Sequence, residues 1–173
     1  MNSFRVWCVV FILLCGGAKA DEKPNLKEVV KEKVEALNKA VIKEEFGKVA
    51  DLTHPRIVKM MGGREKMVVA MASGAKEMKS KGYTITAVTV ANASEPVSAG
   101  SEVYAVVPFE LEMTAPGGKL LQKSFVIGVS SDQGKSWVFV NGDVDPKTVK
   151  QVLPNLPEEL KRPEKQKPVF KKD

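Results

Sequence analysis

A change in hydrophobic periodicity near residue 83 divides this chain into a helical half and a strand-forming half. Before this point apolar residues recur every three or four positions, as they do on one face of an α-helix. After it, β-branched residues alternate with polar ones, as they do in strands. Helices gathered ahead of an antiparallel sheet pack against that sheet, so the order of elements predicts an α+β fold.

Three helices are predicted before residue 83. The first covers residues 26–46 and is expected to end at Gly47, by the preference for glycine at helix C-termini. A short second helix, residues 48–53, is expected to stop at His54, because a residue before proline avoids the helical conformation. The third covers residues 64–81 and follows a pair of glycines.

Four strands and a final helical turn are predicted after residue 83. The strands are expected at residues 83–92, 102–114, 119–131 and 136–141, and the helical turn at 146–153. Pro116 and Gly117 suit the two central positions of a type II turn between the second and third strands. With consecutive antiparallel pairing about that turn, Glu110 is expected to lie directly opposite Lys123.

This order of elements resembles the nuclear transport factor 2-like, or SnoaL-like, superfamily. The resemblance covers residues 26–142, and its local features are residues 46–52 ahead of Thr53-His54-Pro55 and the glycine pair before the third helix. It implies a cone in which N-terminal helices pack on a curved antiparallel sheet of about four strands and enclose a pocket. The superfamily includes isomerases and dehydratases as well as members that catalyse nothing, so the resemblance leaves the function open.

The first 20 residues have the pattern of an export signal. Arg5 precedes an apolar run at residues 6–14, and Ala18-Lys19-Ala20 is the pattern that signal peptidase cuts, here before Asp21. The run is shorter than the roughly 20 apolar residues that a spanning helix needs. We therefore predict a signal peptide at residues 1–20, a periplasmic or secreted product, and no membrane span.

Both cysteines of the chain, Cys8 and Cys15, lie inside this predicted leader. The mature chain would then have no disulfide, no thiolate nucleophile and no cysteine ligand. The alternative to free release is a lipoprotein attached through Cys15, although such signals need a small residue where this chain has Leu14. With one histidine and no cysteine in the mature chain, we expect neither a metal site nor a cofactor.

The mature chain is nearly neutral up to residue 157. Residues 21–157 hold 19 basic and 17 acidic side chains, and Lys and Glu are interleaved along the first helix. Nucleic-acid binders gather their basic residues on one face, so we expect no nucleic-acid partner. Residues 21–153 form the predicted domain, and the Pro- and Lys-rich residues 154–173 are predicted to be a disordered tail, because they bury too little apolar surface.

His54, the only histidine, is the best acid–base candidate. Asp51 lies three residues before it, close enough on a helical turn to orient the imidazole ring. The alternative is a histidine that caps or packs locally at the end of a helix. Glu110 and Glu112 share a strand face opposite the apolar one, so we expect them in solvent rather than in a catalytic pair.

Residues 130–137 match the Asp-box pattern Ser-x-Asp-x-Gly-x-x-Trp, which is similar to the repeated hairpins of sialidase propellers. A single copy does not make a propeller. We expect a structural hairpin in which Asp132 binds turn amides, Gly134 takes a positive φ and Trp137 covers the turn.

Several methionine and aromatic side chains are candidates to line a pocket. Met60, Met61, Tyr83, Tyr104 and Trp137 are placed at the mouth of the predicted cone, around a small apolar ligand. Ordinary core packing is the alternative for these residues.

Both faces of the predicted sheet are apolar near its middle, where residues 103–109 carry hydrophobic side chains on either side. An antiparallel sheet with one wet face alternates more cleanly. In the superfamily the second face commonly meets another copy, so we expect a homodimer through the sheet. The sequence thus predicts an exported domain that binds a small ligand or a partner, and the alternative is an isomerase- or dehydratase-like enzyme using His54 and Asp51.

Overall fold

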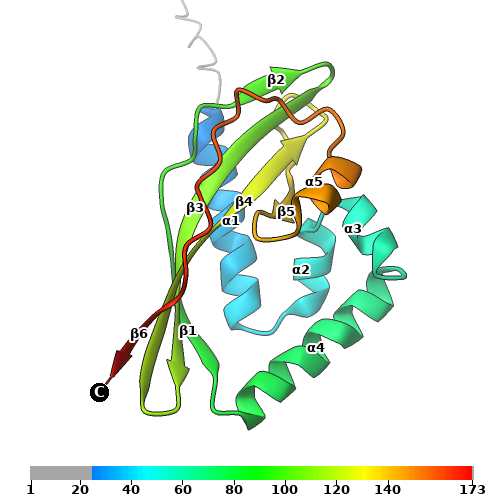
Figure 1. Ribbon diagram of the computed structural model, residues 1–173. Coiled ribbons are helices and arrows are strands. Elements are labelled where there is room, and N and C mark those ends of the chain that lie inside the picture. The colour runs from blue at the N-terminus through cyan, green and yellow to red at the C-terminus, as the bar shows by residue number, and fades with distance from the viewer. Residues whose placement is uncertain (1–24, 173) are drawn as a thin grey trace, which may run out of the picture.

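The computed structural model describes residues 25–172, in which helices precede an open antiparallel sheet (Figure 1). The helices are α1 (Leu26–Ile42), α2 (Phe46–Leu52), α3 (Pro55–Met60), α4 (Arg64–Ser80) and, after the main strands, α5 (Pro146–Val152). The strands are β1 (Thr84–Val90), β2 (Val97–Ala99), β3 (Glu102–Ala115), β4 (Gly118–Ser130), β5 (Val138–Asn141) and β6 (Val169–Lys172). The α+β prediction is confirmed.

The predicted leader, with Cys8, Cys15 and the cut before Asp21, lies outside the described residues. Within residues 25–172, no helix combines the length and the apolar character that crossing a membrane requires.

The four predicted strands form the sheet in the order β1-β3-β4-β5, with antiparallel neighbours as expected. Glu110 lies opposite Lys123 in the β3–β4 hairpin, so the predicted register is confirmed. Gly117 has a φ of 81°, which the second central position of a type II turn requires. Two short strands were not predicted: β2 pairs with β3, and β6 pairs with β4, which makes a six-stranded sheet.

The helices at the start of the chain differ from the prediction at their ends. Helix α1 ends at Ile42 because Glu44 adopts a left-handed φ of 56°, and the Glu45 amide closes the turn by donating to the Ala40 carbonyl at 2.9 Å. Gly47 lies inside α2 instead of ending α1. The His54-Pro55 pair ends α2, as predicted, but it also begins α3, since proline suits the first helical position.

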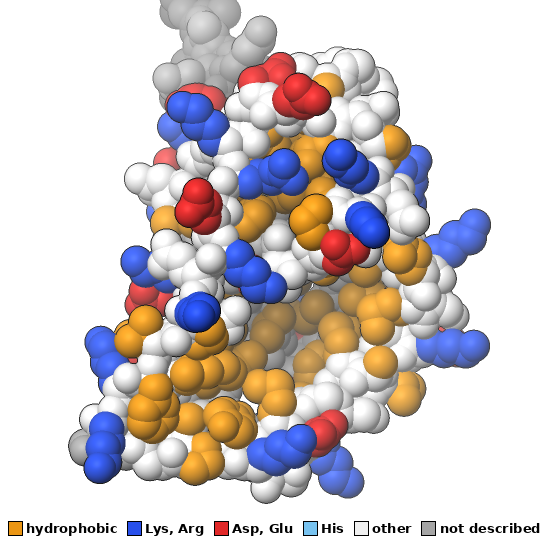
Figure 2. Space-filling view, in the orientation of Figure 1, with side chains coloured by type: hydrophobic (Ala, Val, Ile, Leu, Met, Phe, Trp, Pro, Cys, Tyr) orange, Lys and Arg blue, Asp and Glu red, His pale blue; other side chains and the backbone are white. Residues whose placement is uncertain are grey.

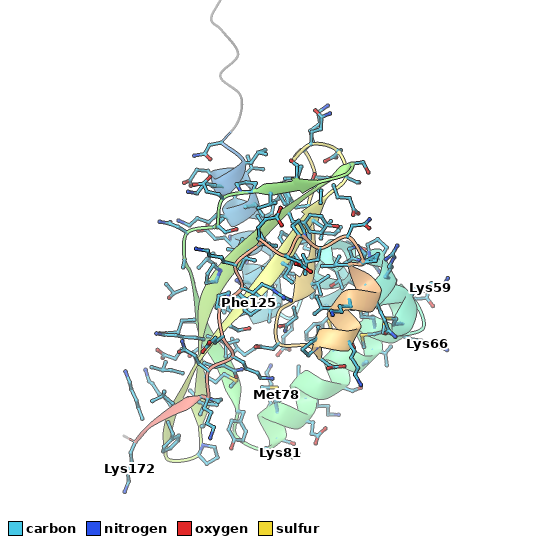
Figure 3. All side chains as sticks on the ribbon, turned by 45° about the horizontal axis from the view of Figure 1, so that its top comes forward. Lys59, Lys66, Met78, Lys81, Phe125 and Lys172 are labelled. Carbon is cyan, nitrogen blue, oxygen red and sulfur yellow. The ribbon has the colours of Figure 1, made fainter. Side chains whose placement is uncertain are left out.

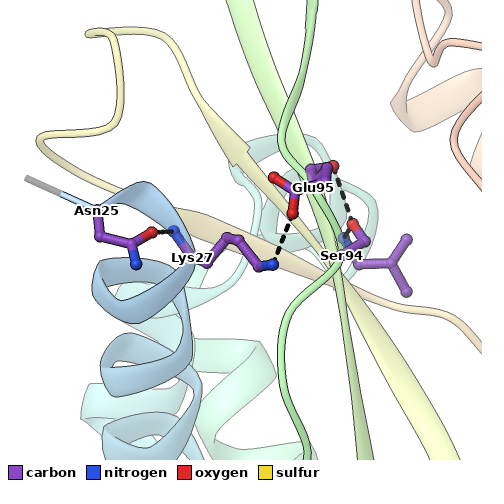
Figure 4. A network of polar contacts seen from close by, with 5 residues as sticks. Asn25, Lys27, Ser94 and Glu95 are labelled. Carbon is purple, nitrogen blue, oxygen red and sulfur yellow. Dashed lines mark hydrogen bonds and ion pairs between the residues drawn. The ribbon is translucent and has the colours of Figure 1, made fainter.

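The start of α1 is tied to the loop before β2 (Figure 4). The Asn25 side chain accepts a hydrogen bond from the Lys27 amide, and Lys27 Nζ lies 2.6 Å from Glu95 Oε1. The neighbouring Ser94 hydroxyl accepts the amide of Val106 at 2.9 Å. These contacts fix α1 across the inner face of the sheet, which is defined here as the face that carries Val107.

The core has two layers, one on each face of the sheet. On the inner face α1 packs with Val30, Val34 and Leu37 against a cluster that includes Val107 and Phe139. On the outer face, defined as the face that carries Val106, side chains of β3, β4 and β5 pack against α5 and against residues that follow it. The buried members of this cluster are Tyr104, Val106, Phe125, Ile127, Val129, Val140, Val149, Val152, Leu153 and Leu160. The apolar middle of the outer face therefore has a cover within its own chain, and the homodimer through the sheet stays a prediction.

The C-terminal segment differs from the predicted disordered tail. It runs along the outer face and ends beside the β3–β4 hairpin (Figure 1). Leu160 is 3% exposed, and β6 pairs with Gly118–Leu121 at the start of β4. A Cβ on Gly118 would lie 2.1 Å from the Lys171 carbonyl oxygen, so only glycine permits this close approach. The polar average composition of the segment does not reveal that Leu156 and Leu160 pack against the apolar outer face of the sheet.

Candidate functional site

A cavity of about 300 Å³ lies between the inner face of the sheet and helices α1, α2 and α4. Figure 2 shows a hollow between the sheet and α4 that is surrounded by hydrophobic side chains. The lining residues come from α1 to α4, from β1, β3, β4 and β5, and from the turn after β5: Leu37, Asn38, Val41, Val49, Thr53, Ile57, Met67, Val88, Phe109, Leu111, Val126, Phe139, Val140, Asn141 and Val144. None of these lining residues carries a charge.

The cavity exists because α4 stands away from the sheet. Helix α4 packs on α2 and α3, and Met67 is its only buried residue. Figure 3 shows Met78 near the other end of α4, where it lines a smaller hollow of about 100 Å³ together with Tyr83. Val41 borders both hollows, so they lie side by side along α1.

Ion pairs attach α4 at both of its ends. Arg64 binds the Asp51 carboxylate through two contacts of 2.6 and 2.9 Å, and it donates to the Gly47 carbonyl at 3.2 Å. At the other end Lys79 Nζ lies 2.5 Å from Glu44 Oε1. Polar contacts on the surface thus hold both ends of α4, and Met67, near the start of this helix, is its one residue that lines the cavity.

One polar side chain at the cavity stands out. Asn38, on α1, is 8% exposed, and its Nδ2 is the only buried side-chain nitrogen or oxygen of residues 25–172 without a hydrogen-bond partner. A buried donor without a partner costs about 1–3 kcal/mol. In the other two polar side chains of the lining, the Thr53 hydroxyl donates to the Val49 carbonyl, and Asn141 Oδ1 accepts the Asp143 amide.

The structure does not bring the two predicted catalytic residues together. The Asp51 carboxylate is bound by Arg64, and this hydrogen bond lowers the pKa of Asp51. His54 caps α3, where its Nδ1 accepts the Arg56 amide at 3.3 Å. Burial lowers the pKa of His54, and the charge of Arg56 lowers this pKa further. His54 lines a separate surface hollow of about 500 Å³, beside Arg56 and Glu102.

The five predicted ligand-binding residues are also dispersed. Met60 and Met61 are 57% and 41% exposed at the end of α3. Tyr104 is buried in the outer-face core, where its hydroxyl donates to Glu102, whereas Trp137 is buried on the inner face. Tyr83 lines only the small hollow beside Met78. Asn38 was missed, although an asparagine within the apolar stripe of the first predicted helix was a signal for it.

The Asp-box residues form the predicted structural hairpin. Asp132 accepts the Ser136 amide at 2.8 Å, and Gly134 has a φ of 91°. Trp137 is 3% exposed, and its indole nitrogen donates to the Gly134 carbonyl. Hydrogen bonds from Ser136 and Ser130 lower the pKa of Asp132 to about 2.

The two strand carboxylates are half-buried, and Glu110 lines a hollow together with Lys123 and residues of the C-terminal segment. Glu112 Oε1 lies 2.9 Å from Lys119 Nζ, and the hydrogen bond from Lys119 lowers the pKa of Glu112. Among residues 25–172, no group of three or more His, Cys, Asp or Glu side chains could hold a metal ion.

No family model, curated protein or solved structure matches this chain. The cavity under α4, with its buried amide, is therefore the feature from which a function has to be argued.

Proposed function

We propose that this protein binds a small, uncharged, largely apolar molecule in the cavity between the inner face of the sheet and α4. The observation that carries the proposal is a cavity of about 300 Å³ whose lining residues are all uncharged. Ligand cavities in proteins begin at about this volume. An apolar cavity of roughly 150 Å³ accommodates benzene, so this one has room for a molecule of about two fused rings.

The alternative to a ligand is an ordinary packing defect, and the construction of the cavity argues against it. Protein cores are packed nearly as densely as organic crystals, with few voids larger than a water molecule. Here the hollow is bordered by residues from four helices and four strands, and its α4 residue, Met67, belongs to a helix that polar contacts hold at both ends. A hollow built in this way is better explained by an occupant.

The proposal includes the cone architecture of the nuclear transport factor 2-like superfamily. It is supported by α1 lying across one face of the sheet and by a cavity between that face and the helices. Export is also part of the proposal and rests on the pattern of residues 1–20. An isomerase- or dehydratase-like activity is not favoured, because neither His54 nor Asp51 lines the cavity.

Binding can be tested by filling the cavity. Val88 lines it, whereas Val169 on β6 is 57% exposed and is not one of its lining residues, so Val88→Phe and Val169→Phe form a matched pair. We expect the mature chain and Val169→Phe to bind 2-ethylnaphthalene in calorimetric titrations, and Val88→Phe to lose this binding while remaining folded.

Undiminished binding by Val88→Phe would place the probe elsewhere and refute the proposal. A native mass spectrum of the chain purified from a periplasm would complement this test. It would show whether the protein starts at Asp21 and whether it carries an extra mass that leaves on denaturation.

A further inference from the structure

We infer that the hollow beside His54 is a second binding site, and that its ligand is a small zwitterion of the α-amino acid class. In this arrangement the ligand carboxylate lies against Arg56 and His54, and the ligand ammonium group lies against Glu102. The hollow has a volume of about 500 Å³ and shares no lining residue with the cavity under α4. The inference therefore goes beyond the proposed function and does not depend on it.

The hollow brings together residues that are far apart in the chain. Its lining comes from the start of α3, the start of β3, the Asp-box hairpin, and the end of α5 with the residues after it. Of these lining residues, only Arg56 and Glu102 carry a charge at pH 7. Val138 and Leu153 are among its apolar members. One positive group, one negative group and an apolar wall match the three parts of an amino acid with an apolar side chain.

His54 supplies a nearly buried donor at this hollow. The side chain is 9% exposed, and its Nδ1 accepts the Arg56 amide, so the proton of the neutral ring is on Nε2. Among residues 25–172, Nε2 of His54 has no hydrogen-bond partner, and it is not one of the fully buried atoms that lack one. A ligand oxygen in the hollow can therefore accept a hydrogen bond from it.

Both charges of the hollow lie near the imidazole ring. Burial lowers the pKa of His54, the positive charge of Arg56 lowers it further, and the negative charge of Glu102 raises it. The ring is therefore neutral at pH 7 and donates from Nε2 without competing with Arg56 for the same negative charge.

Arg56 is positioned by the end of α5. Its Nη1 donates to the carbonyls of Val152 and Gln151 at 2.9 and 3.4 Å, a contact that basic side chains often make with the last carbonyls of a helix. The N–H groups on Nε and Nη2 have no partner among residues 25–172, and Arg56 pairs with no carboxylate there. A guanidinium fixed along one edge can bind a ligand carboxylate through its remaining donors.

Glu102 supplies the opposite charge. It is half-buried, and its Oε2 accepts the hydroxyl of the fully buried Tyr104 at 2.5 Å. Its Oε1 has no partner, and no basic side chain of residues 25–172 pairs with Glu102. Arg56 and Glu102 thus line one hollow without forming an ion pair with each other, which leaves each of them available to one charge of a zwitterion.

Three probes of one shape separate a zwitterion site from a site for a single charge. Norleucine carries both charges, hexanoate carries only the carboxylate, and pentylammonium carries only the ammonium group. His54 is the only histidine of the chain, so its Cε1–H signal in NMR titrations at pH 7 reports on this hollow. In the mature chain we expect norleucine to shift this signal saturably and to bind at least about tenfold more tightly than either analogue, because each analogue loses one charge-assisted hydrogen bond.

Two variants assign the charges. Arg56→Gln should weaken the binding of norleucine and of hexanoate about tenfold and should not weaken that of pentylammonium. Glu102→Gln keeps an acceptor for Tyr104 and should weaken the binding of norleucine and of pentylammonium by a similar factor, but not that of hexanoate. Lys59→Gln removes an exposed cation of α3 outside the lining, so this control should bind all three probes as the wild type does.

The comparison of the three probes needs no variant, so it decides the question even where a variant does not fold. Equal binding of norleucine and either analogue would overturn the inference, and so would the absence of a saturable shift with all three probes. Norleucine binding that is undiminished in both Arg56→Gln and Glu102→Gln would also overturn it. Binding of 2-ethylnaphthalene to the cavity under α4 is measured separately and should be unchanged in both variants, so the failure of one site is distinguishable from that of the other.

Discussion

Replacing Leu160 by alanine tests whether the C-terminal segment covers the outer face of the sheet. Leu160 is 3% exposed and belongs to the outer-face core cluster. Buried Leu→Ala replacements cost about 2–5 kcal/mol, and a segment near the chain end can partly close the gap, so we expect about 2–3 kcal/mol. Urea unfolding of the mature chain measures this loss. Val169→Ala, in a side chain that is 57% exposed, should change the free energy of unfolding by no more than about 0.5 kcal/mol.

Two truncations extend this test from one side chain to the whole segment. A chain that ends at residue 162 keeps Leu160 and should remain as stable as the full mature chain within about 0.5 kcal/mol. A chain that ends at residue 154 uncovers the outer-face core around Tyr104 and Ile127 and should self-associate in sedimentation experiments. Equal stability of Leu160→Ala and the wild type, together with a monomeric 154-residue truncation, would refute the account of the outer face.

Three further predictions follow from individual contacts. Ser130→Ala should lower the free energy of unfolding by about 1–3 kcal/mol, measured in urea, because the Gly134 amide loses its acceptor at 2.8 Å; an unchanged value would contradict this role. Burial lowers the pKa of His54 in the folded state, so the contribution of His54 to stability is complete above the pKa of the unfolded chain, near 6.5, and is lost as the pH falls below it. His54→Asn keeps a capping side chain, so its free energy of unfolding should change less than that of the wild type between pH 7 and 5. A pH dependence like that of the wild type would refute this prediction. Gly118→Ala should detach β6 from β4, because the new Cβ would lie 2.1 Å from the Lys171 carbonyl; hydrogen exchange at β6 should then be faster, and unchanged protection would show that β6 is not held there.

The sheet could be predicted from the sequence because its information is local. Alternation identifies each long strand, and the Pro116-Gly117 turn fixes how the two longest strands align. Once the turn is known, the pairing of Glu110 with Lys123 follows from counting residues. Helix ends were less predictable, since Glu44 adopts a left-handed conformation that the sequence rules assign to glycine.

The site was harder to predict because residue type says little about where a side chain lies. Tyr104 and Trp137 both suit a binding pocket, yet they occupy opposite faces of the sheet in two different cores. Asp51 is near His54 in sequence, but its carboxylate binds Arg64, which is 13 residues away along the chain. Asn38 becomes visible only when the partners of every buried polar atom are known.

The cavity itself can be traced to the composition of α4. Only Met67 of this helix is buried, and its half-buried residues are Val68, Met71 and the small Ala75. A leucine at the half-buried position Ala75 would fill part of the smaller hollow beside Met78 and would widen the apolar face of the helix. Exposed ion pairs contribute little to stability, so the contacts of Arg64 and Lys79 hold α4 only loosely. With one buried side chain and exposed ion pairs at its two ends, α4 leaves the hollow between itself and the sheet unfilled.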